Sequence, residues 1–441
     1  MPKPNVIVFF TDQQRWDTTG VHGNPLELTP NFDRLALEGT HCFNAFTCQP
    51  VCAPARAVLQ TGKYATNTGV YRNGIVLGEE HRTLAHYFKQ GGYNTAYIGK
   101  WHLSKGEPVP RNNQGEYDYW LAANALEHTS DTYHTVVYDR DGKKIFLPGY
   151  RVDALTDAAI RYVVKEGETG EKNPFFLFLS FLEPHHQNHV DDYPPPPGYR
   201  EKYTGRWIPG DLAALGGSSP QHLGGYFGMV KRLDEALGRL LDVLQSLGKL
   251  DNTIILYTTD HGNHFKTRNA EYKRSCHEAS IRIPMALSGP GFKGGGRITD
   301  LVSLVDMPPT LLEAAGLPVP PEMEGRSILD GRKDWPGDVF VQISESHVGR
   351  VFSSVSSVSV SDFEHKTFAI SSNFSSIVMV FPSSSVFYIL FTEQDSVFLA
   401  VCVEGHGFQP HKPRGNHVNG EILHQRATVC ELVDLLVRFV Q

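Results

Sequence analysis

Continuous apolar runs alternate along this chain with stretches of helical periodicity. The apolar runs predict strands at Val6–Thr11, Tyr93–Gly99, Phe175–Leu182 and Thr253–Thr259. The periodic stretches predict a helix that starts at Pro30 with Thr29 as its N-cap, and helices over Thr83–Gln90, Val152–Lys165 and Gln221–Leu247. Unbroken apolar strands between helices are typical of a parallel sheet that is buried on both faces. The fold class is therefore expected to be α/β, with a large, mostly parallel sheet sandwiched by helices.

Polar side chains follow each of the four predicted strands. They are Asp12 after the first strand, Lys100 and His102 after the second, His185 after the third, and Asp260-His261 after the fourth. Ligands of parallel α/β sheets bind at the carboxyl ends of the strands, where these side chains would meet. The sequence therefore predicts a functional site at this edge of the sheet.

The segment around Cys52 adds a second signal. A helical run over Pro54–Gln60 follows Cys52 and ends at Thr61-Gly62, and Arg56 lies one turn into it. A helix N-terminus and an arginine both favour an anionic ligand, and a cysteine placed there is prone to be a thiolate nucleophile. A free cysteine is more often a small core residue, so a structural role for Cys52 stays open on this evidence alone.

Composition excludes several classes of function. The net charge of −7 argues against general nucleic-acid binding, and no apolar run is long enough for a membrane span. Six cysteines in 441 residues predict neither a disulfide scaffold nor a zinc site. Met1-Pro2-Lys3-Pro4 leads directly into the first strand without a signal-peptide pattern, so we expect a cytoplasmic protein, or a periplasmic or secreted one if a leader was removed.

Three motifs together resemble a known family. Cys52-Ala53-Pro54-Ala55-Arg56 with Thr61-Gly62-Lys63 resembles the signature of the type I sulfatases, in the alkaline phosphatase-like superfamily. Gly99-Lys100-Trp101-His102 and Pro184-His185 match two further family motifs. The resemblance implies hydrolysis of a sulfate monoester by a formylglycine hydrate. It also implies a partner, a formylglycine-generating or anaerobic sulfatase-maturating enzyme, that converts Cys52 to Cα-formylglycine.

The resemblance also implies roles for individual residues. The implied catalytic residues, with cationic side chains around the sulfate, are Cys52, Arg56, Lys100, His102, His185 and Lys273. The implied metal ligands are Asp12, Gln13, Cys52, Asp260 and His261, and the expected substrate contacts are Asn73, His264 and His277. In the implied mechanism Asp260 helps to deprotonate the attacking hydroxyl, His185 or Lys273 protonates the leaving group, and His102 takes the proton from the second hydroxyl.

Two positions depart from the common sulfatase pattern. Gln13 and His261 stand where many sulfatases have Asp and Asn, and they resemble the phosphonate monoester hydrolase and choline-sulfatase branch. Calcium remains the expected metal, and an imidazole ligand also suits Mn²⁺. A phosphonate monoester or phosphodiester hydrolase is therefore one alternative, which Lys100 and His102 disfavour. A catalytically inactive relative that binds sulfated glycans is another.

Aromatic residues near the predicted site indicate the substrate class. Tyr71, Trp101 and Tyr272, together with nearby histidines, suit a sulfated carbohydrate as substrate.

We expect a catalytic domain over residues 1–335 and a smaller C-terminal α+β subdomain over 336–441. From about residue 351 the family pattern fades into a Ser/Val-rich segment, which either a divergent tail or a frameshifted gene end would explain. The alternation of Ser and Val predicts a small antiparallel sheet there.

Overall fold

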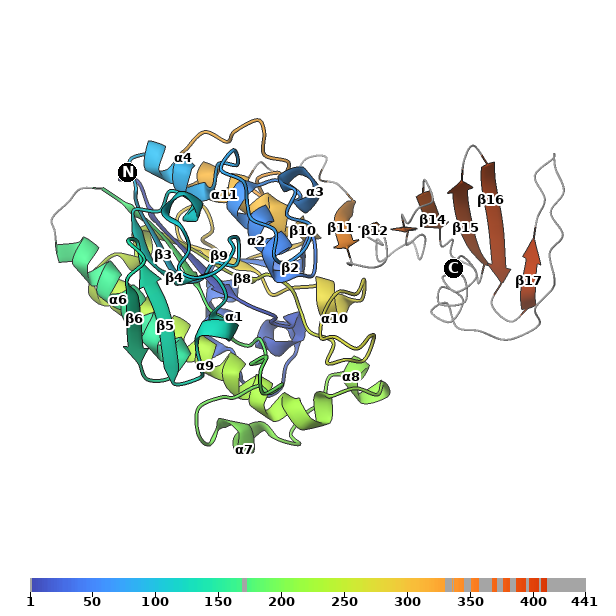
Figure 1. Cartoon of the computed structure of the whole chain (residues 1–441), viewed down its shortest axis with the longest axis horizontal. Coiled ribbons are helices and arrows are strands. Elements are labelled where there is room, and N and C mark those ends of the chain that lie inside the picture. Colours follow the sequence, from blue (N-terminus) through green and yellow to red (C-terminus); the bar gives the residue numbers. More distant parts are fainter. Residues whose placement is uncertain are drawn as a thin grey trace. The chain divides into compact units, whose positions relative to one another are not determined.

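The computed structural model describes residues 2–168, 173–329, 335, 337–344, 350–356, 367–370, 376–380, 386–393, 396–403 and 406–410. The chain divides into two compact units, Met1–Ser344 and Glu345–Gln441. Figure 1 shows the elements of both units.

A ten-stranded sheet forms the centre of the first unit. Its strands are β1 (Asn5–Thr11), β2 (Thr40–Phe46), β3 (Asn94–Lys100), β4 (Tyr119–Ala123), β5 (His134–Asp139), β6 (Lys144–Pro148), β7 (Phe175–Ser180), β8 (Thr253–Thr259), β9 (Ala286–Ser288) and β10 (Gly296–Ser303), and β11 (Asp338–Ser344) follows outside this sheet. The strand order is β10-β2-β9-β8-β1-β7-β3-β4-β5-β6. The five strands from β8 to β4 are parallel, and antiparallel pairs flank them, so the prediction of a mostly parallel sheet is confirmed.

Helices cover both faces of this sheet. They are α1 (Pro30–Glu38), α2 (Cys52–Thr61), α3 (Ala65–Thr68), α4 (Leu84–Gln90), α5 (Leu126–Thr129), α6 (Arg151–Glu168), α7 (Tyr199–Tyr203), α8 (Gly210–Ala214), α9 (Ser219–Ser246), α10 (Glu278–Ile281) and α11 (Met307–Ala314). Short 3₁₀ turns lie at Trp16–Thr18, Gly20–His22, Arg111–Asn113, Leu250–Asn252 and Leu304–Asp306. No helix in the described part of the chain has the length and apolar character needed to cross a membrane.

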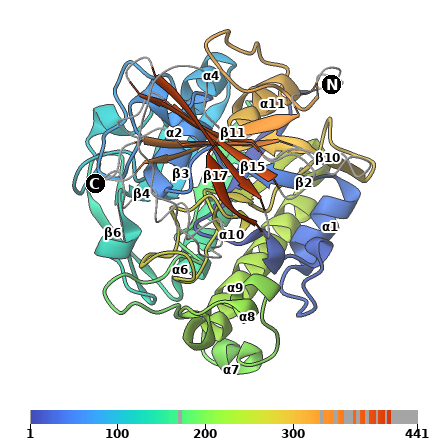
Figure 2. The same cartoon turned by 90° about the vertical axis from the view of Figure 1, so that its right-hand side faces the viewer.

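The side chains of β1 show how the two faces are filled. Val6, Val8 and Phe10 belong to a core cluster with residues of α2, α4 and α11. Ile7 and Phe9 point the other way and join residues of α1, α6 and α9. Figures 1 and 2 show these two groups of helices on opposite sides of the sheet. The period of two along a strand thus produces the three-layer arrangement, because every residue of β1 is buried on one face or the other.

The N-terminus of α1 corrects one detail of the predicted fold. Pro30 is the first helical residue, as expected, but the Thr29 side chain makes no capping hydrogen bond. Instead the Asp234 carboxylate, on α9, accepts hydrogen bonds from the backbone N–H groups of Asn31 at 3.1 Å and Phe32 at 2.8 Å. A carboxylate is the better partner because it also interacts favourably with the helix dipole.

The described part of the second unit consists of strands. They are β12 (Arg350–Ser356), β13 (Thr367–Ile370), β14 (Ser376–Val380), β15 (Val386–Glu393), β16 (Ser396–Val403) and β17 (His406–Pro410). β13 to β17 form a five-stranded antiparallel sheet in chain order, as the Ser/Val alternation predicts. The helical component of the predicted subdomain lies outside the described residues.

Candidate active site

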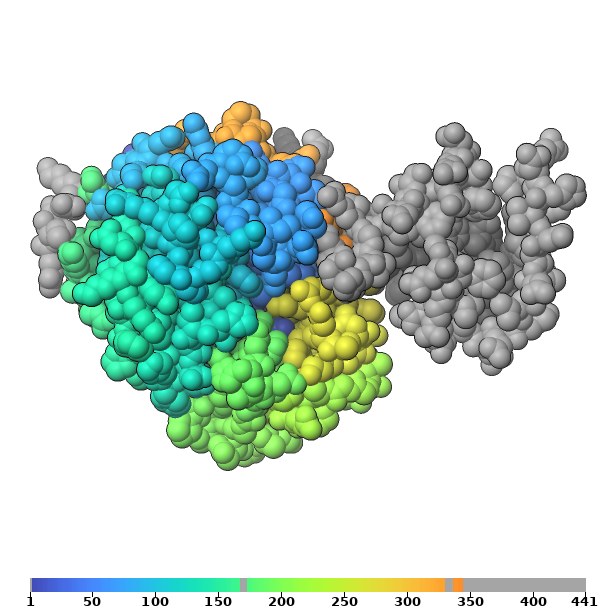
Figure 3. All heavy atoms as spheres, viewed as in Figure 1, coloured from blue at the N-terminus to red at the C-terminus, as the bar shows by residue number. Residues whose placement is uncertain are grey.

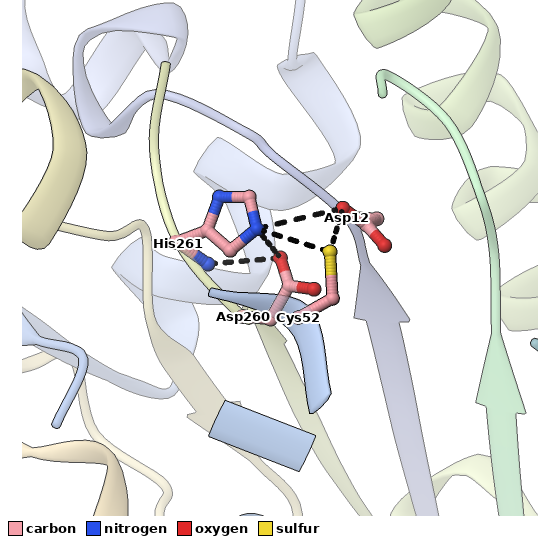
Figure 4. A group of neighbouring side chains, drawn as sticks. All are labelled: Asp12, Cys52, Asp260 and His261. Carbon is pink, nitrogen blue, oxygen red and sulfur yellow. Dashed lines mark hydrogen bonds and ion pairs between the residues drawn. The ribbon is translucent and has the colours of Figure 1, made fainter. Parts of the chain in front are cut away.

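The carboxyl ends of four neighbouring strands converge as the sequence predicts. The strands are β8, β1, β7 and β3, which are adjacent in the sheet, and they lead to Asp260, Asp12, His185 and Lys100 respectively. Cys52 joins them from the first turn of α2. Figure 4 shows Asp12, Cys52, Asp260 and His261 pointing toward one another.

These four residues form a cluster that could hold a metal ion. One ligand atom from each lies within 4.8 Å of the others, and all four residues are buried. The Cys52 sulfur lies 3.3 Å from Nε2 of His261 and 3.6 Å from Oδ1 of Asp12. Asp260 Oδ2 is buried and accepts no hydrogen bond from the described residues. Burial and the Asp12 carboxylate raise the pKa of Asp260 to about 7. Two adjacent buried carboxylates, one of which has an oxygen that accepts no hydrogen bond from the described residues, are an environment that a hard cation stabilises, so the donor set fits a divalent ion.

Gln13 lies beside this cluster in a left-handed backbone conformation, with φ of 66°. Its N–H donates to Asp260 Oδ1 at 3.0 Å, and its side-chain Oε1 lies 3.3 Å from Nδ1 of His186. Its Nε2 is buried without a partner among the described residues. The position beside Asp260 is compatible with the predicted ligand role, which stays a prediction.

Arg56 forms ion pairs with the carboxylates of the cluster, and it does not line the pocket. Its side chain is only 2% exposed, and Nη2 lies 2.9 Å from Asp12 Oδ2 and 3.5 Å from Asp260 Oδ2. Nη1 donates to the Ser180 hydroxyl at 2.7 Å and to the Lys100 carbonyl at 2.9 Å. Arg56 is not among the pocket-lining residues. Nη1 and Nη2 of Arg56 therefore have partners within the protein, and the predicted place of Arg56 around the sulfate stays a prediction.

Lys100 is also fully buried, between two acidic side chains. Its ammonium lies 2.7 Å from Asp12 Oδ2, 2.9 Å from Glu127 Oε1 and 3.9 Å from the Cys52 sulfur. The preceding Gly99 has φ of 111°, and a Cβ there would lie 1.8 Å from the Ser180 carbonyl oxygen. Only glycine permits this approach of β3 to β7, so Gly99 fixes where Lys100 leaves the strand.

Lys273 brings a second ammonium to the same sulfur. Its Nζ lies 2.9 Å from Cys52 Sγ and 3.3 Å from Nε2 of both His185 and His261. Burial alone would raise the pKa of the Cys52 thiol, but Lys100 and Lys273 outweigh it and hold that pKa well below its usual value. Burial and Lys273 lower the pKa of His185, so its imidazole is held neutral. Position 52 is therefore a strongly electropositive spot that stabilises negative charge.

A pocket of about 450 Å³ opens onto this group. It is lined by Cys52, Asn73, His102, Glu127, His128, His185, His186, Asn188, Asp191, Lys266, Ala270, Glu271, Tyr272, Lys273 and Arg274. The blue, teal, green and yellow parts of the surface in Figure 3, which hold these segments, meet on the visible face. The lining is polar and mixed in charge, as suits a hydrophilic anion.

The three predicted substrate contacts differ in position. Asn73 lines the pocket, and its Oδ1 accepts a hydrogen bond from the Ala53 N–H at 3.0 Å, which caps the start of α2. His264 and His277 are not among the lining residues. His264 is fully buried, and its Nε2 lies 2.9 Å from the carbonyl oxygen of Lys273. His264 thus contacts the backbone of the Lys273 loop. The pocket lining does not support the predicted substrate role of His264 and His277.

Sequence reasoning missed Glu127, which also lines the pocket. Glu127 follows β4, the parallel neighbour of β3, so it obeys the strand-end rule that identified the other residues. The five-residue β4 gives a weak apolar signal, so the sequence alone does not identify it as a strand of the sheet.

Comparison with known proteins agrees with this geometry. A family model described as Sulfatase matches residues 4–317. The ulvan-active sulfatase of Formosa agariphila is 32% identical over 343 residues, which are 74% of this chain and 65% of that protein. The N-acetylglucosamine-6-O-sulfatase of Bacteroides thetaiotaomicron is 27% identical over 416 residues, covering 76% and 72% of the two chains.

The fold is shared with solved structures as well. One, from work on glycosaminoglycan metabolism by Bacteroides thetaiotaomicron, superposes with a TM-score of 0.71 at 22% identity and covers 90% of this chain and 89% of that one. At this identity the likeness speaks for the fold alone. The match of the family model over most of the first unit shows that this chain belongs to the sulfatase family.

Proposed function

We propose that this protein hydrolyses sulfate monoesters, and that residue 52 carries the nucleophile after conversion of Cys52 to Cα-formylglycine. The observation that supports this best is the surroundings of the Cys52 sulfur. It lies in the pocket lining, 2.9 Å from the Lys273 ammonium and 3.3 Å from a ring nitrogen of His261. Cationic groups fixed around the reacting position stabilise charge that develops in the transition state.

The side chains in the pocket suit the separate proton transfers. Lys273 and His185 lie 3.3 Å apart, so an ammonium and a neutral imidazole share a hydrogen bond beside residue 52. Lys273 can protonate the departing alkoxide directly, or it can pass its proton to Nε2 of His185, which then protonates the alkoxide. His102 lines the same pocket, and its Nδ1 has no hydrogen-bond partner among the described residues. In the proposal His102 accepts the proton from residue 52 when sulfate is released.

A divalent cation is part of the proposal. Asp12, Gln13, Asp260 and His261 would hold it together with residue 52. When bound, such an ion polarises a sulfate oxygen and lowers the pKa of a hydroxyl group bound to it. Calcium suits the carboxylate oxygens, and Mn²⁺ would tolerate the His261 imidazole better than calcium does.

The proposed substrate class is a sulfated carbohydrate. Two relatives, an ulvan-active sulfatase and an N-acetylglucosamine-6-O-sulfatase, are named for activity on such molecules. The chain spans 65% of the length of the ulvan-active sulfatase. The substrate class of this protein is therefore a proposal. Histidine, asparagine and tyrosine side chains in the pocket lining can bind sugar hydroxyls and ring faces.

Mass spectrometry of the Cys52 peptide, combined with an aryl sulfate assay, tests the proposal. Conversion of the thiol to an aldehyde lowers the peptide mass by roughly 18 Da, unlike oxidations that add oxygen. We expect this mass change in the active protein, and loss of turnover in Cys52→Ala with an unchanged melting temperature. A fully converted protein that fails to hydrolyse any sulfate ester would refute the activity. An unconverted Cys52 in cells that contain a maturating enzyme would favour an inactive, glycan-binding relative.

A further inference from the structure

Glu127 is a buried carboxylate in the pocket that the proposed chemistry does not use. It belongs to α5, directly after β4, and it is only 5% exposed. It lines the pocket together with Cys52 and His102. A buried charge is costly unless both of its oxygens are paired, so the partners of each oxygen are informative.

The two oxygens of Glu127 differ. Oε1 forms an ion pair with the Lys100 ammonium at 2.9 Å. Oε2 is buried and has no hydrogen-bond partner in the described part of the chain. Burial would raise the pKa of Glu127, but Lys100 and His102 lower it to about 2, so the group is a carboxylate at neutral pH. A carboxylate only accepts hydrogen bonds, and the missing partner of Oε2 is therefore a donor.

A hydrogen bond to the backbone of Glu127 also fixes its position. Its carbonyl oxygen accepts a hydrogen bond from Gln187 Nε2 at 3.2 Å, and the same Nε2 donates to the Ser130 carbonyl at 3.0 Å. Gln187 Oε1 in turn accepts from the buried Arg151 guanidinium at 3.1 Å. With backbone and Oε1 both fixed, Oε2 cannot swing away to find a partner on the protein.

The other charged groups in the outer pocket already have partners. Lys266 pairs with Asp191 at 2.8 Å, and Arg274 pairs with Glu271. His102 also lines the pocket with an Nδ1 that has no partner among the described residues, but it makes no hydrogen bond to Oε2, so the occupant of the pocket can supply the missing donor. Resting on the proposed function, we infer that Glu127 is a specificity-determining residue that accepts a hydrogen bond from a neutral donor of the substrate, a hydroxyl or amide N–H next to the sulfate ester. The same carboxylate disfavours an anionic group at that position, because two like charges would meet in a desolvated site.

The test compares binding of matched ligands to the Cys52→Ala variant by calorimetry. The ligands are monosulfated glycosides with a free hydroxyl beside the ester, the analogues with hydrogen there, those with an acetamido group there, and those with a second sulfate there. We expect the hydroxyl or the acetamido ligand to bind at least about tenfold more tightly than the hydrogen analogue, as for a substrate donor paired with a buried acceptor. The vicinal disulfate should bind most weakly.

Glu127→Gln in the same background isolates the second oxygen. Because Lys100 is a donor, the amide oxygen should stay toward Lys100, and the amide NH₂ should replace Oε2. We expect the preference for the donor-bearing ligand to fall to about twofold or less, and the disfavour of the disulfate to shrink. Glu127→Asp, which keeps the charge but withdraws it, should lower the preference less. Asp131→Asn is a matched control outside the pocket, and it should keep the full preference.

Equal affinities for the donor-bearing and hydrogen analogues would overturn the inference, because water alone would then satisfy Oε2. A preference that persists in Glu127→Gln would also overturn it. Turnover of an unsubstituted aryl sulfate by the formylglycine-containing wild type reports on the proposed function separately. Loss of that turnover with the binding preference intact would refute hydrolysis and keep the recognition role of Glu127.

Discussion

The Lys273 ammonium lies 2.9 Å from the Cys52 sulfur, although 221 positions separate the two residues in the sequence. The Lys273 loop reaches the N-terminus of α2 and places a fixed positive charge against residue 52. Nε2 of the His264 ring lies 2.9 Å from the carbonyl oxygen of Lys273, and this contact stabilises the loop.

Replacing Lys273 should slow the chemical step. We expect Lys273→Ala to lower kcat/KM for an aryl sulfate by about 10²- to 10³-fold, as for loss of one preorganised donor to a transition state. Lys266→Ala is the control, because that ammonium pairs with Asp191 at the rim, and its effect should stay below about fivefold. A Lys273→Ala enzyme within about threefold of wild type would remove Lys273 from the proposed mechanism.

Removing the metal should inactivate the enzyme without unfolding it. We expect dialysis against a chelator to abolish aryl sulfate turnover, and Ca²⁺ or Mn²⁺ to restore it. Asp12→Asn and Asp260→Asn should each reduce both activity and bound metal, roughly 10- to 100-fold or more for metal affinity. Elemental analysis of the purified protein gives the identity and amount of the ion. Full activity in protein that holds no metal after chelation would contradict the cation site.

A comparison of esters separates a sulfatase from a phosphodiester hydrolase. His102, His185 and Lys273 surround residue 52 in the pocket, and together they can bind each free oxygen of a terminal sulfate. In a diester one of those oxygens carries an organic group. With formylglycine confirmed, kcat/KM for an aryl sulfate should exceed that for the matching phosphodiester or phosphonate by at least about tenfold, which is roughly 1.4 kcal/mol. A preference for the diester would mean that Gln13 and His261 were the better guide to function.

The cap on α1 gives a prediction about stability. Asp234→Ala leaves the N–H groups of Asn31 and Phe32 without their partner, so we expect a loss of about 1–2 kcal/mol. The measurement is the denaturant midpoint at constant m-value. Asp242→Ala on the same helix is the control, because that side chain is exposed and its loss should be close to neutral. An equal effect of the two substitutions would show that Asp234 does not act as the cap.

The central strands and most site residues were predictable because they combine strong local signals. β1 and β8 lie at the predicted positions, since an unbroken apolar run followed by Asp is distinctive. The flanking strands escaped prediction. β9 has three residues, and β5 and β6 carry exposed polar positions, so they depend on the partners beside them.

Two of the predicted site residues have partners that the sequence does not reveal. Arg56 and His264 have the right chemistry to contact an anion, but the fold uses their nitrogen atoms for Asp12 and for the Lys273 carbonyl. The Asp234 cap on α1 likewise comes from more than two hundred residues away. Such pairings depend on tertiary contacts, and no local spacing reports them. The resemblance to a family found the residues, and only the geometry shows which partner each one has.

The burial of α2 has a consequence for timing. All ten of its residues are buried, and Cys52 is only 1% exposed. In the folded domain the segment around Cys52 is therefore shielded from a second protein. If Cys52 is converted as proposed, the conversion would have to occur before the chain folds, in competition with folding. The fraction of active protein in a preparation would then depend on the rate of conversion relative to the rate of folding. Slower folding during synthesis would raise that fraction.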